Sequence, residues 1–351
     1  MAMGADFQAI AQRIEANALG RLMYGQRELF HSNLIAWFFA ELPDVADAVF
    51  KPMAPPGSSP ERWVDRESNN LDLVMHWPDR APLVIENKVF SLPDLAQLNK
   101  YQEATAGWKP APALVLLSIS EPDFDLNGWS FLSYAELSQR ILSALPASAR
   151  YEIETMRRYA GLADDLHRLV SAVDVKSDQE RVWLPESLLD AISSSQMRAA
   201  LRKARAQRVA RIINGHVPGL ETAAKGDMSN ATPFIECLEY VRLGGMDLRL
   251  GWQLQGGQFR SAVVYGDNAV KGGSKARREK REVLSREHPE FFEFPQGLPQ
   301  TPDGRKEFNH FAPSFVYRYV KVPELTVSEL KAIAVEVHGA VEALRQRDSP
   351  G

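Results

Sequence analysis

The stretch NNLDLVMHWPDRAPLVIENKVF, residues 69–90, decides the fold of the N-terminal half of the chain. It holds two strand-like runs, NNLDLVMHW (69–77) and PLVIENKVF (82–90), separated by the turn cluster PDR (78–80). Two such runs around a short turn predict a β-hairpin. The second run is apolar until it ends in charged residues, and charges at the end of an apolar strand are costly unless they have partners or a task.

Those charges belong to a set that the hairpin brings together. Alternate residues of a strand share a face, so Glu86 and Lys88 point the same way. Pairing the strands symmetrically about Arg80 places Asp72 opposite Lys88 and Val74 opposite Glu86. Asp72 then lies diagonal to Glu86, at about 7–8 Å. A one-residue slip of this register would separate the faces.

Two carboxylates at that reach can hold a hard divalent cation through oxygen, with water in the remaining positions. A lysine beside them can orient or deprotonate one of these waters. The pattern therefore predicts a metal-plus-base site suited to hydrolysing a phosphodiester. The alternative is a structural salt bridge at a sheet edge, which is frequent and contributes little to stability.

The flanking segments predict an α/β core around the hairpin. Residues 7–42 have helical spacing and stop at Pro43, and a loop rich in Pro, Gly and Ser follows. Residues 92–106 are expected to be helical, with Pro93 in the first turn. The apolar run 113–119 lacks alternation, as in a strand covered on both faces, and helices are expected within 134–170.

From about residue 175 the pattern changes to a smaller α+β domain. A basic helical stretch (186–214) precedes a meander of three strands with Gly-Gly turns (240–267). A further strand (311–322) and an amphipathic helix (326–346) follow. We therefore expect two domains, residues 1–172 and 173–351.

Composition excludes several classes of protein. The 351 residues are 45% hydrophobic and 25% charged, the usual mix of a globular protein. Cys237 is the only cysteine, so neither an internal disulfide nor a Cys-based zinc site can form. No apolar run is long enough to span a bilayer, and the N-terminus MAMGADFQAI lacks the pattern of a secretory signal. We expect a cytoplasmic protein.

Four motifs, in order, resemble the PD-(D/E)XK nuclease superfamily. The similarity is greatest to a bacterial branch that begins with a Glu-x-x-His-Ser helix. The motifs are Glu28-Leu29-Phe30-His31-Ser32, Asn70-Leu71-Asp72-Leu73-Val74, Val84-Ile85-Glu86-Asn87-Lys88 and Gln97-Leu98-Asn99-Lys100-Tyr101. The resemblance covers roughly residues 20–160 and implies a restriction-endonuclease-like αβββαβ core.

The resemblance also implies roles for these residues. Asp72 and Glu86 would be direct metal ligands, with the carbonyl of Asn87 as a third. Lys88 would position the attacking water and stabilise the phosphorane-like negative charge. Glu28 would reach the metal through water, and Gln97 would orient the water or the scissile phosphate.

Structural alternatives stand beside several of these roles. Glu28 could be a solvated helix position, the ordinary case for an exposed glutamate. His31, at i+3 from Glu28, is favoured as a hydrogen-bonded structural histidine over a site residue. Gln97 and Tyr101, at i and i+4, fit packing contacts as well as they fit a functional role.

The N-terminal half of the chain is acidic and the C-terminal half is slightly basic. Residues 1–170 carry 15 basic and 22 acidic residues, and the remainder carries 26 and 23. Two basic stretches could supply phosphate contacts. In the first, Arg198, Arg202 and Arg205 share a helical face. In the second, which a solvated face explains equally well, the basic residues are Lys271, Lys275, Arg277, Arg278, Lys280 and Arg281.

Aromatic residues of the C-terminal domain are a further candidate. Trp252, Phe259, Tyr317 and Tyr319 could stack on bases, although strand aromatics are more often core.

The sequence thus favours a Mg²⁺-dependent endonuclease, with Mn²⁺ able to substitute and with DNA favoured over RNA as the substrate. The resemblance places it in bacterial antiviral defence, with the C-terminal domain recognising the target or regulating access. Two alternatives stay open: a non-catalytic nucleic-acid-binding module, and an interaction protein that is silent until a protein trigger binds. No membrane partner is expected, and a homodimer stays open.

Overall fold

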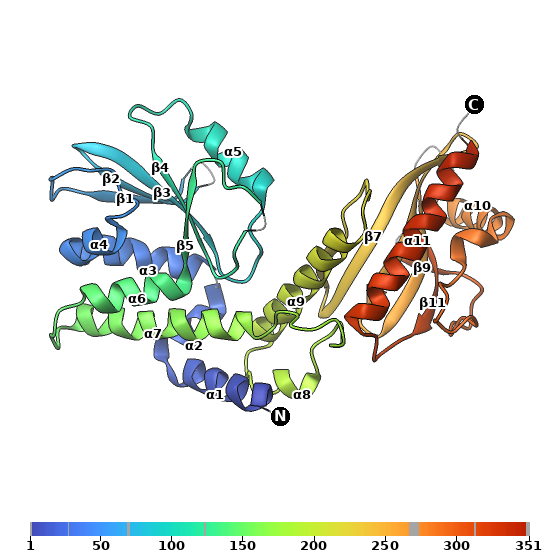
Figure 1. The fold of residues 1–351 in the computed structure, drawn as a ribbon, viewed down its shortest axis with the longest axis horizontal. Helices are drawn as coiled ribbons and strands as arrows, with labels where there is room; N and C mark the ends of the chain where they lie inside the picture. Colours follow the sequence, from blue (N-terminus) through green and yellow to red (C-terminus); the bar gives the residue numbers. More distant parts are fainter. Residues whose placement is uncertain are drawn as a thin grey trace. The chain divides into compact units, whose positions relative to one another are not determined.

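The computed structural model describes residues 2–26, 28–68, 71–122, 124–266, 274–311 and 314–348. The chain forms two compact units. Unit 1 comprises Met1–Val173 and Pro185–Leu201, and unit 2 comprises Asp174–Leu184 and Arg202–Gly351. Each unit contains one β-sheet, so the fold is mixed α/β (Figure 1).

Unit 1 is built on a five-stranded sheet whose strands lie in chain order. The first three strands are antiparallel, and the last two run parallel to β3. A parallel neighbour needs a crossover, which helix α5 (Leu95–Thr105) supplies between β3 and β4. The strands are β1 (Trp63–Ser68), β2 (Leu71–Trp77), β3 (Arg80–Lys88), β4 (Ala113–Ser118) and β5 (Trp129–Ser133).

The hairpin register differs from the symmetric pairing about Arg80. The observed pairs include Leu73 with Ile85 and Trp77 with Arg80. Arg80 is therefore the first residue of β3, and the turn is shorter than expected. The tighter turn moves the pairing by three residues, and a bulge on the β3 side, beside Pro82, moves it back by one. The net shift of two residues brings Asp72 level with Glu86 rather than Lys88, and all three still share one face.

Helices cover both faces of this sheet (Figure 1). α5 lies on one face and begins at the N-cap Asp94, one residue beyond Pro93, which precedes the helix. α3 and α6 lie on the other face, where their side chains bond Asn87 of β3. The helices other than α5 are α1 (Ala2–Ala16), α2 (Ala18–Gln26), α3 (Glu28–Glu41), α4 (Pro43–Phe50), α6 (Tyr134–Ala144), α7 (Tyr151–Ser171) and α8 (Glu186–Leu189).

Unit 2 is built on a six-stranded antiparallel sheet of order β10-β11-β9-β8-β7-β6. Gly244 and Gly245 make the β7–β8 turn with positive φ, which glycine adopts without steric cost. The strands are β6 (Lys225–Ser229), β7 (Thr232–Leu243), β8 (Met246–Gln255), β9 (Gln258–Tyr265), β10 (Asn309–Phe311) and β11 (Phe315–Lys321).

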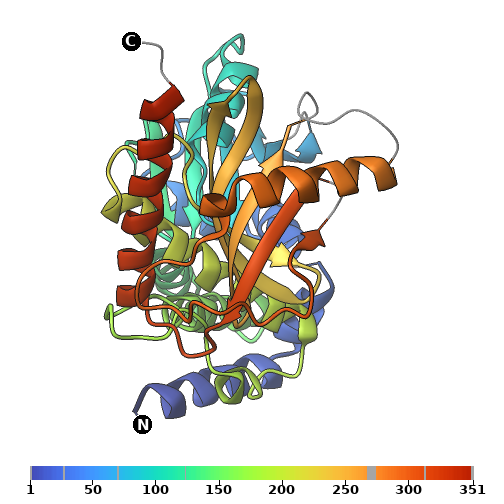
Figure 2. The same cartoon turned by 90° about the vertical axis from the view of Figure 1, so that its right-hand side faces the viewer.

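The helices of unit 2 pack on one face of its sheet. α9 (Ser195–His216), which belongs to unit 2 from Arg202 onward, and α11 (Val327–Asp348) share a core with the strands. Figure 2 shows α10 (Ser274–Glu287) in front of the strands, and Ser285 of α10 bonds Tyr265 of β9. The short η1 helix (Pro289–Phe292) completes this layer. Among the described residues, none of the helices is both long and apolar enough to cross a membrane.

Candidate metal and phosphodiester site

Three side chains of β2 and β3 meet on the α5 face of the unit 1 sheet. Glu86 is 0% exposed, and Lys88 Nζ lies 2.8 Å from Glu86 Oε1. The backbone N–H of Asn87 donates a 2.9 Å hydrogen bond to Asp72 Oδ2. The structure therefore brings Asp72, Glu86 and Lys88 together, as the sequence predicted.

The electrostatics of this group favour a bound cation. Burial, and then the charge of Asp72, raise the pKa of Glu86 to about 8, although Lys88 acts in the opposite direction. The ionised form of Glu86 is therefore disfavoured, and Lys88 offsets this effect only in part. A divalent cation between the two carboxylates would supply further positive charge.

The donor set fits a hard cation. Glu86 Oε2 is buried, and no described residue donates a hydrogen bond to it when both carboxylates are ionised. A buried acceptor without a donor needs a partner, and oxygen ligands of this kind suit Mg²⁺ or Mn²⁺. Asp72 and Glu86 are the residues that would hold the ion.

Asn87 can join such a site through its main chain only. Its side-chain amide is buried on the opposite face of the sheet, where Nδ2 donates to Ser32 Oγ at 3.3 Å and Oδ1 accepts from Tyr134 Oη. This side chain ties β3 to α3 and α6. It does not point toward the carboxylates.

Helix α5 contributes the second pair of predicted residues. Gln97 Nε2 donates to Tyr101 Oη at 2.7 Å. Burial raises the pKa of Tyr101, and the charges of Glu86 and Asp72 raise it further, so Tyr101 lies within electrostatic reach of both. The hydrogen bond to Tyr101 fixes the orientation of the Gln97 side chain.

The first helical motif is described in part. Glu28 is the first residue of α3, and its side chain lies outside the described residues. His31 is fully buried, with Nδ1 3.1 Å from Tyr159 Oη and Nε2 3.2 Å from Met23 Sδ. It also packs edge-on against Tyr134, on the Asn87 side of the sheet. His31 is therefore a structural histidine.

The first basic stretch requires a correction. Arg205 is 2% exposed, and its guanidinium donates to the carbonyls of Arg181 and Val182 and to Glu180. This buried group cannot contact a phosphate, so the assignment of Arg205 to nucleic-acid binding is wrong. Arg198 and Arg202 are half-buried on α9.

The second basic stretch is described only at its end. Arg278 is exposed and forms an ion pair with Glu282 at 3.7 Å. The side chains of Lys275 and Arg277, and the whole of Lys271, lie outside the described residues.

The aromatic candidates divide between the two faces of the unit 2 sheet. Trp252 and Phe259 stack in the buried core, so they cannot reach a base. Tyr317 and Tyr319 lie half-buried on the opposite face, where the guanidinium of Arg260 covers the Tyr317 ring at 4.6 Å.

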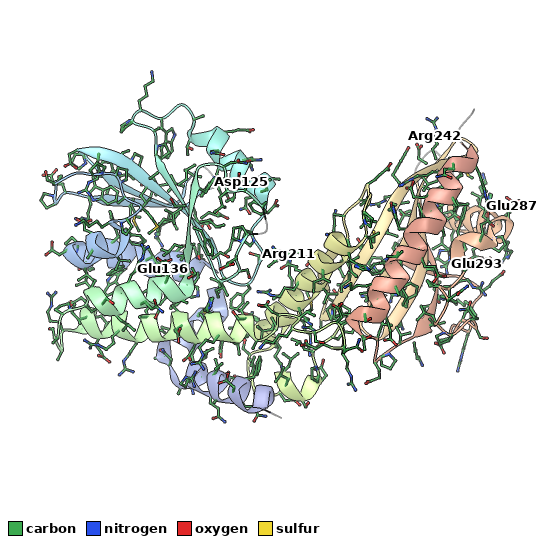
Figure 3. The ribbon with its side chains drawn as sticks, in the orientation of Figure 1. Asp125, Glu136, Arg211, Arg242, Glu287 and Glu293 are labelled. Atoms are coloured by element: carbon green, nitrogen blue, oxygen red, sulfur yellow. The ribbon has the colours of Figure 1, made fainter. Side chains whose placement is uncertain are left out.

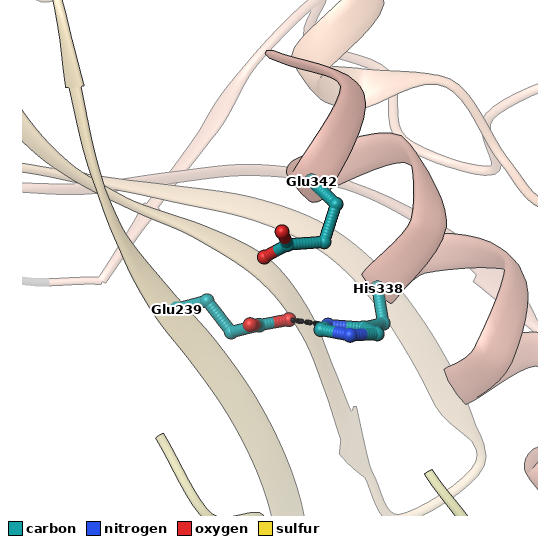
Figure 4. A group of neighbouring side chains, drawn as sticks. All are labelled: Glu239, His338 and Glu342. Atoms are coloured by element: carbon teal, nitrogen blue, oxygen red, sulfur yellow. Dashed lines mark hydrogen bonds and ion pairs between the residues drawn. The ribbon is translucent and has the colours of Figure 1, made fainter. Parts of the chain in front are cut away.

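Unit 2 also holds a group that the sequence did not indicate. Glu239 of β7 lies beside His338 and Glu342 of α11, with ligand atoms within 4.8 Å of one another (Figure 4). Ninety-nine residues separate Glu239 from His338, so no local motif marks the group. Arg345 contacts both glutamates, and its guanidinium provides the positive charge that a metal would otherwise provide. These contacts describe an ion-pair network.

Comparison of the chain with protein-family models, curated proteins and solved structures gives no match.

Proposed function

We propose that the chain is a metal-dependent phosphodiesterase of the nuclease type. The observation that carries this proposal is the convergence of Asp72, Glu86 and Lys88 on one sheet face, with the Lys88 ammonium 2.8 Å from a fully buried carboxylate. A structural salt bridge needs only one carboxylate. Here the second one, Asp72, raises the pKa of Glu86 and so destabilises the pair when no cation is bound.

The order of elements supports a restriction-endonuclease-like core. With α4 inserted between α3 and β1, the elements α3, β1, β2, β3, α5 and β4 have the αβββαβ order that the sequence resemblance implies. The carboxylates lie on the second and third strands of this core, and Gln97 lies on the helix that follows. The preference for DNA over RNA rests on the resemblance.

Each residue then has a chemical task. Asp72 and Glu86 would hold Mg²⁺ or Mn²⁺, which polarises a phosphoryl oxygen and lowers the pKa of water. Lys88 can hold the attacking water by a hydrogen bond and stabilise negative charge on the phosphate. Gln97, whose side-chain amide donates to Tyr101 Oη, would donate to the water or the phosphate.

A cleavage assay tests the proposal. The wild-type chain is incubated with plasmid, linear and single-stranded DNA and with RNA, in Mg²⁺ or Mn²⁺. We expect Lys88→Ala to lower the cleavage rate at least a hundredfold, and Lys100→Ala, an exposed lysine of α5, to leave it unchanged. Equal rates for wild type and Lys88→Ala would contradict the proposal.

A second candidate, a nuclease that is silent until a partner binds, is favoured by the burial of its site. Glu86 is 0% exposed and the Lys88 side chain is 12% exposed, so little of either reaches a substrate in this conformation. This candidate predicts that calorimetry detects Mn²⁺ binding to wild type but not to Asp72→Ala, while no substrate is cleaved. Absence of both Mn²⁺ binding and cleavage would contradict both candidates.

A further inference from the structure

An exposed aromatic stack lies on the same sheet as the carboxylates. Trp63 of β1 stacks on His76 of β2, with ring centroids 4.9 Å apart and an interplanar angle of 2°. His76 also stacks against Trp108, which follows α5, at 6.5 Å and 28°. Trp63 is nevertheless 51% exposed. Much of this large apolar side chain is therefore open to a ligand.

The stack and the carboxylates occupy one face of the sheet. Trp63 pairs directly with His76, and directly opposed residues share a face. His76 and Asp72 are four residues apart on β2, so they also share that face, about 13 Å apart along the strand. This span corresponds to about four stacked nucleotides, at roughly 3.4 Å for each.

The polar group nearest to the stack suits a base better than a phosphate. The carboxylate of Asp65 lies 3.0 Å from His76 Nε2 and is half exposed. A carboxylate repels phosphate, whereas it accepts hydrogen bonds from the exocyclic amine of a base. Asp65 follows Trp63 by two residues on β1, so its side chain lies on the same face.

The geometry of Trp63 is set before any ligand binds. Trp63 already stacks on His76, which itself contacts Trp108, so the indole loses little freedom when a second ring covers its exposed surface. Any of the bases can stack on the Trp63 indole, since every base has a π-face.

From these observations we propose that Trp63 is a stacking platform for an unpaired base of the nucleic acid that the carboxylate site cleaves, with Asp65 accepting from the amine of that base. This inference rests on the proposed function. It adds that the substrate carries a single-stranded or extruded nucleotide, a few nucleotides away from the scissile phosphate.

Binding of short single-stranded DNA to the full chain tests the platform. The probe contains 2-aminopurine, whose fluorescence falls when it stacks on an aromatic ring, and every protein carries Lys88→Ala to prevent cleavage. We expect Trp63→Ala to weaken binding about tenfold and to abolish the quenching. Trp63→Phe, which keeps a stacking ring, should recover most of both signals and also controls for folding.

Matched controls separate stacking from other contacts. Tyr151→Ala removes another exposed aromatic of unit 1 and should bind like the parent protein. A probe with abasic positions keeps its phosphates, so Trp63→Ala should have no further effect on its binding. Asp65→Asn should reduce the preference for amine-bearing bases over thymine.

The outcomes distinguish this inference from the proposed function. If Lys88→Ala abolishes cleavage while Trp63→Ala binds and quenches like Tyr151→Ala, the platform is wrong and the nuclease stands. If wild type neither cleaves nor binds any nucleic acid, both are wrong. If Trp63→Ala disrupts only the binding of a protein partner, the platform is also overturned.

Discussion

At the scale of single residues, unit 1 keeps two kinds of buried polar group on opposite faces of one sheet. On the α5 face, burial and the neighbouring Asp72 make ionised Glu86 unfavourable, and a bound cation would remove this electrostatic penalty. On the other face, Asn87 and His31 have hydrogen-bond partners from α3, α6 and α7. The first kind is typical of a functional site and the second of a structural core.

His31 should make the protein sensitive to acid. Burial lowers the pKa of His31 to about 3, whereas an unfolded histidine titrates near 6.5. Between these values the unfolded state binds a proton that the native state does not. The free energy of unfolding should therefore fall by about 1.4 kcal/mol per pH unit as the pH drops below 6.5.

Urea unfolding from pH 7 to pH 4 measures this slope. His31→Gln should reduce it by that amount, while His216→Gln, an exposed histidine, should leave it unchanged. A slope that is the same in wild type and His31→Gln would show that His31 does not cause the sensitivity.

Glu86 should lower the stability of the metal-free protein at high pH, although metal binding requires it. Because its pKa is raised to about 8, the native state keeps a proton that the unfolded state releases above about pH 4.5. This group therefore lowers the free energy of unfolding as the pH rises toward 8. Glu86→Gln should abolish Mn²⁺ binding in calorimetry yet unfold at higher urea concentration than the metal-free wild type at pH 8.5.

Glu103→Gln, an exposed glutamate of α5, is the matched control and should change neither measurement. Retention of Mn²⁺ binding by Glu86→Gln would exclude Glu86 as a ligand.

The core of the site was predictable from the sequence, because strand alternation alone puts Glu86 and Lys88 on one face. The burial of Arg205 was not predictable. Its partner Glu180 lies 25 residues away and outside α9, so helical spacing gives no sign of the contact. The contact of Glu239 with His338 was invisible for the same reason.

At the scale of elements, long apolar or periodic segments were predicted well and short polar ones were not. β3, β4, α7 and α11 lie where their patterns indicate. β1 was missed because its residues, WVDRES, are mostly polar, which is typical of an edge strand. The hairpin register was misplaced by two residues because the strands turn at Pro78 and Asp79 rather than about Arg80, and the bulge beside Pro82 offsets only part of that difference.

Helix α9 carries an element-scale prediction. Arg205 joins α9 to residues 180–182 through two carbonyls and one carboxylate, all within unit 2. Arg205→Ala would leave the buried Val182 carbonyl and two partly buried acceptors without this donor, so we expect the free energy of unfolding to fall by about 3 kcal/mol. Urea unfolding followed by circular dichroism measures the change.

Arg242 is the matched control, since it projects into solvent (Figure 3) and its ion pair with Asp247 is long, 3.9 Å. Arg242→Ala should cost less than about 1 kcal/mol. An equally small cost for Arg205→Ala would mean that the buried network does not stabilise unit 2.

At the scale of the whole chain, the two units do not correspond to two continuous segments. Residues 185–201 belong to unit 1, although residues 174–184 before them belong to unit 2. Glu15 of α1 accepts hydrogen bonds from Ser193 N at 3.1 Å and Ser193 Oγ at 2.7 Å. A composition change near residue 175 indicates where the chain leaves unit 1, but it carries no sign of this return.

Residues 185–201, which rejoin unit 1, should contribute to its stability. A chain ending at residue 173 lacks the buried side chains of Leu189 and Ile192 and leaves Glu15 without its Ser193 donors. Burial of one such aliphatic side chain contributes roughly 1.5–3 kcal/mol. We expect the chain ending at 173 to unfold at least 5 °C below a chain ending at 201, measured by thermal circular dichroism.

In the full chain, Glu15→Ala should lower stability by about 1–2 kcal/mol, since Glu15 also accepts from Tyr24 Oη. Equal unfolding temperatures for the two truncated chains, with no effect of Glu15→Ala, would mean that unit 1 is complete at residue 173. In that case residues 185–201 would only connect the units. Reduced stability in both experiments would instead make this segment part of the fold that positions Asp72, Glu86 and Lys88.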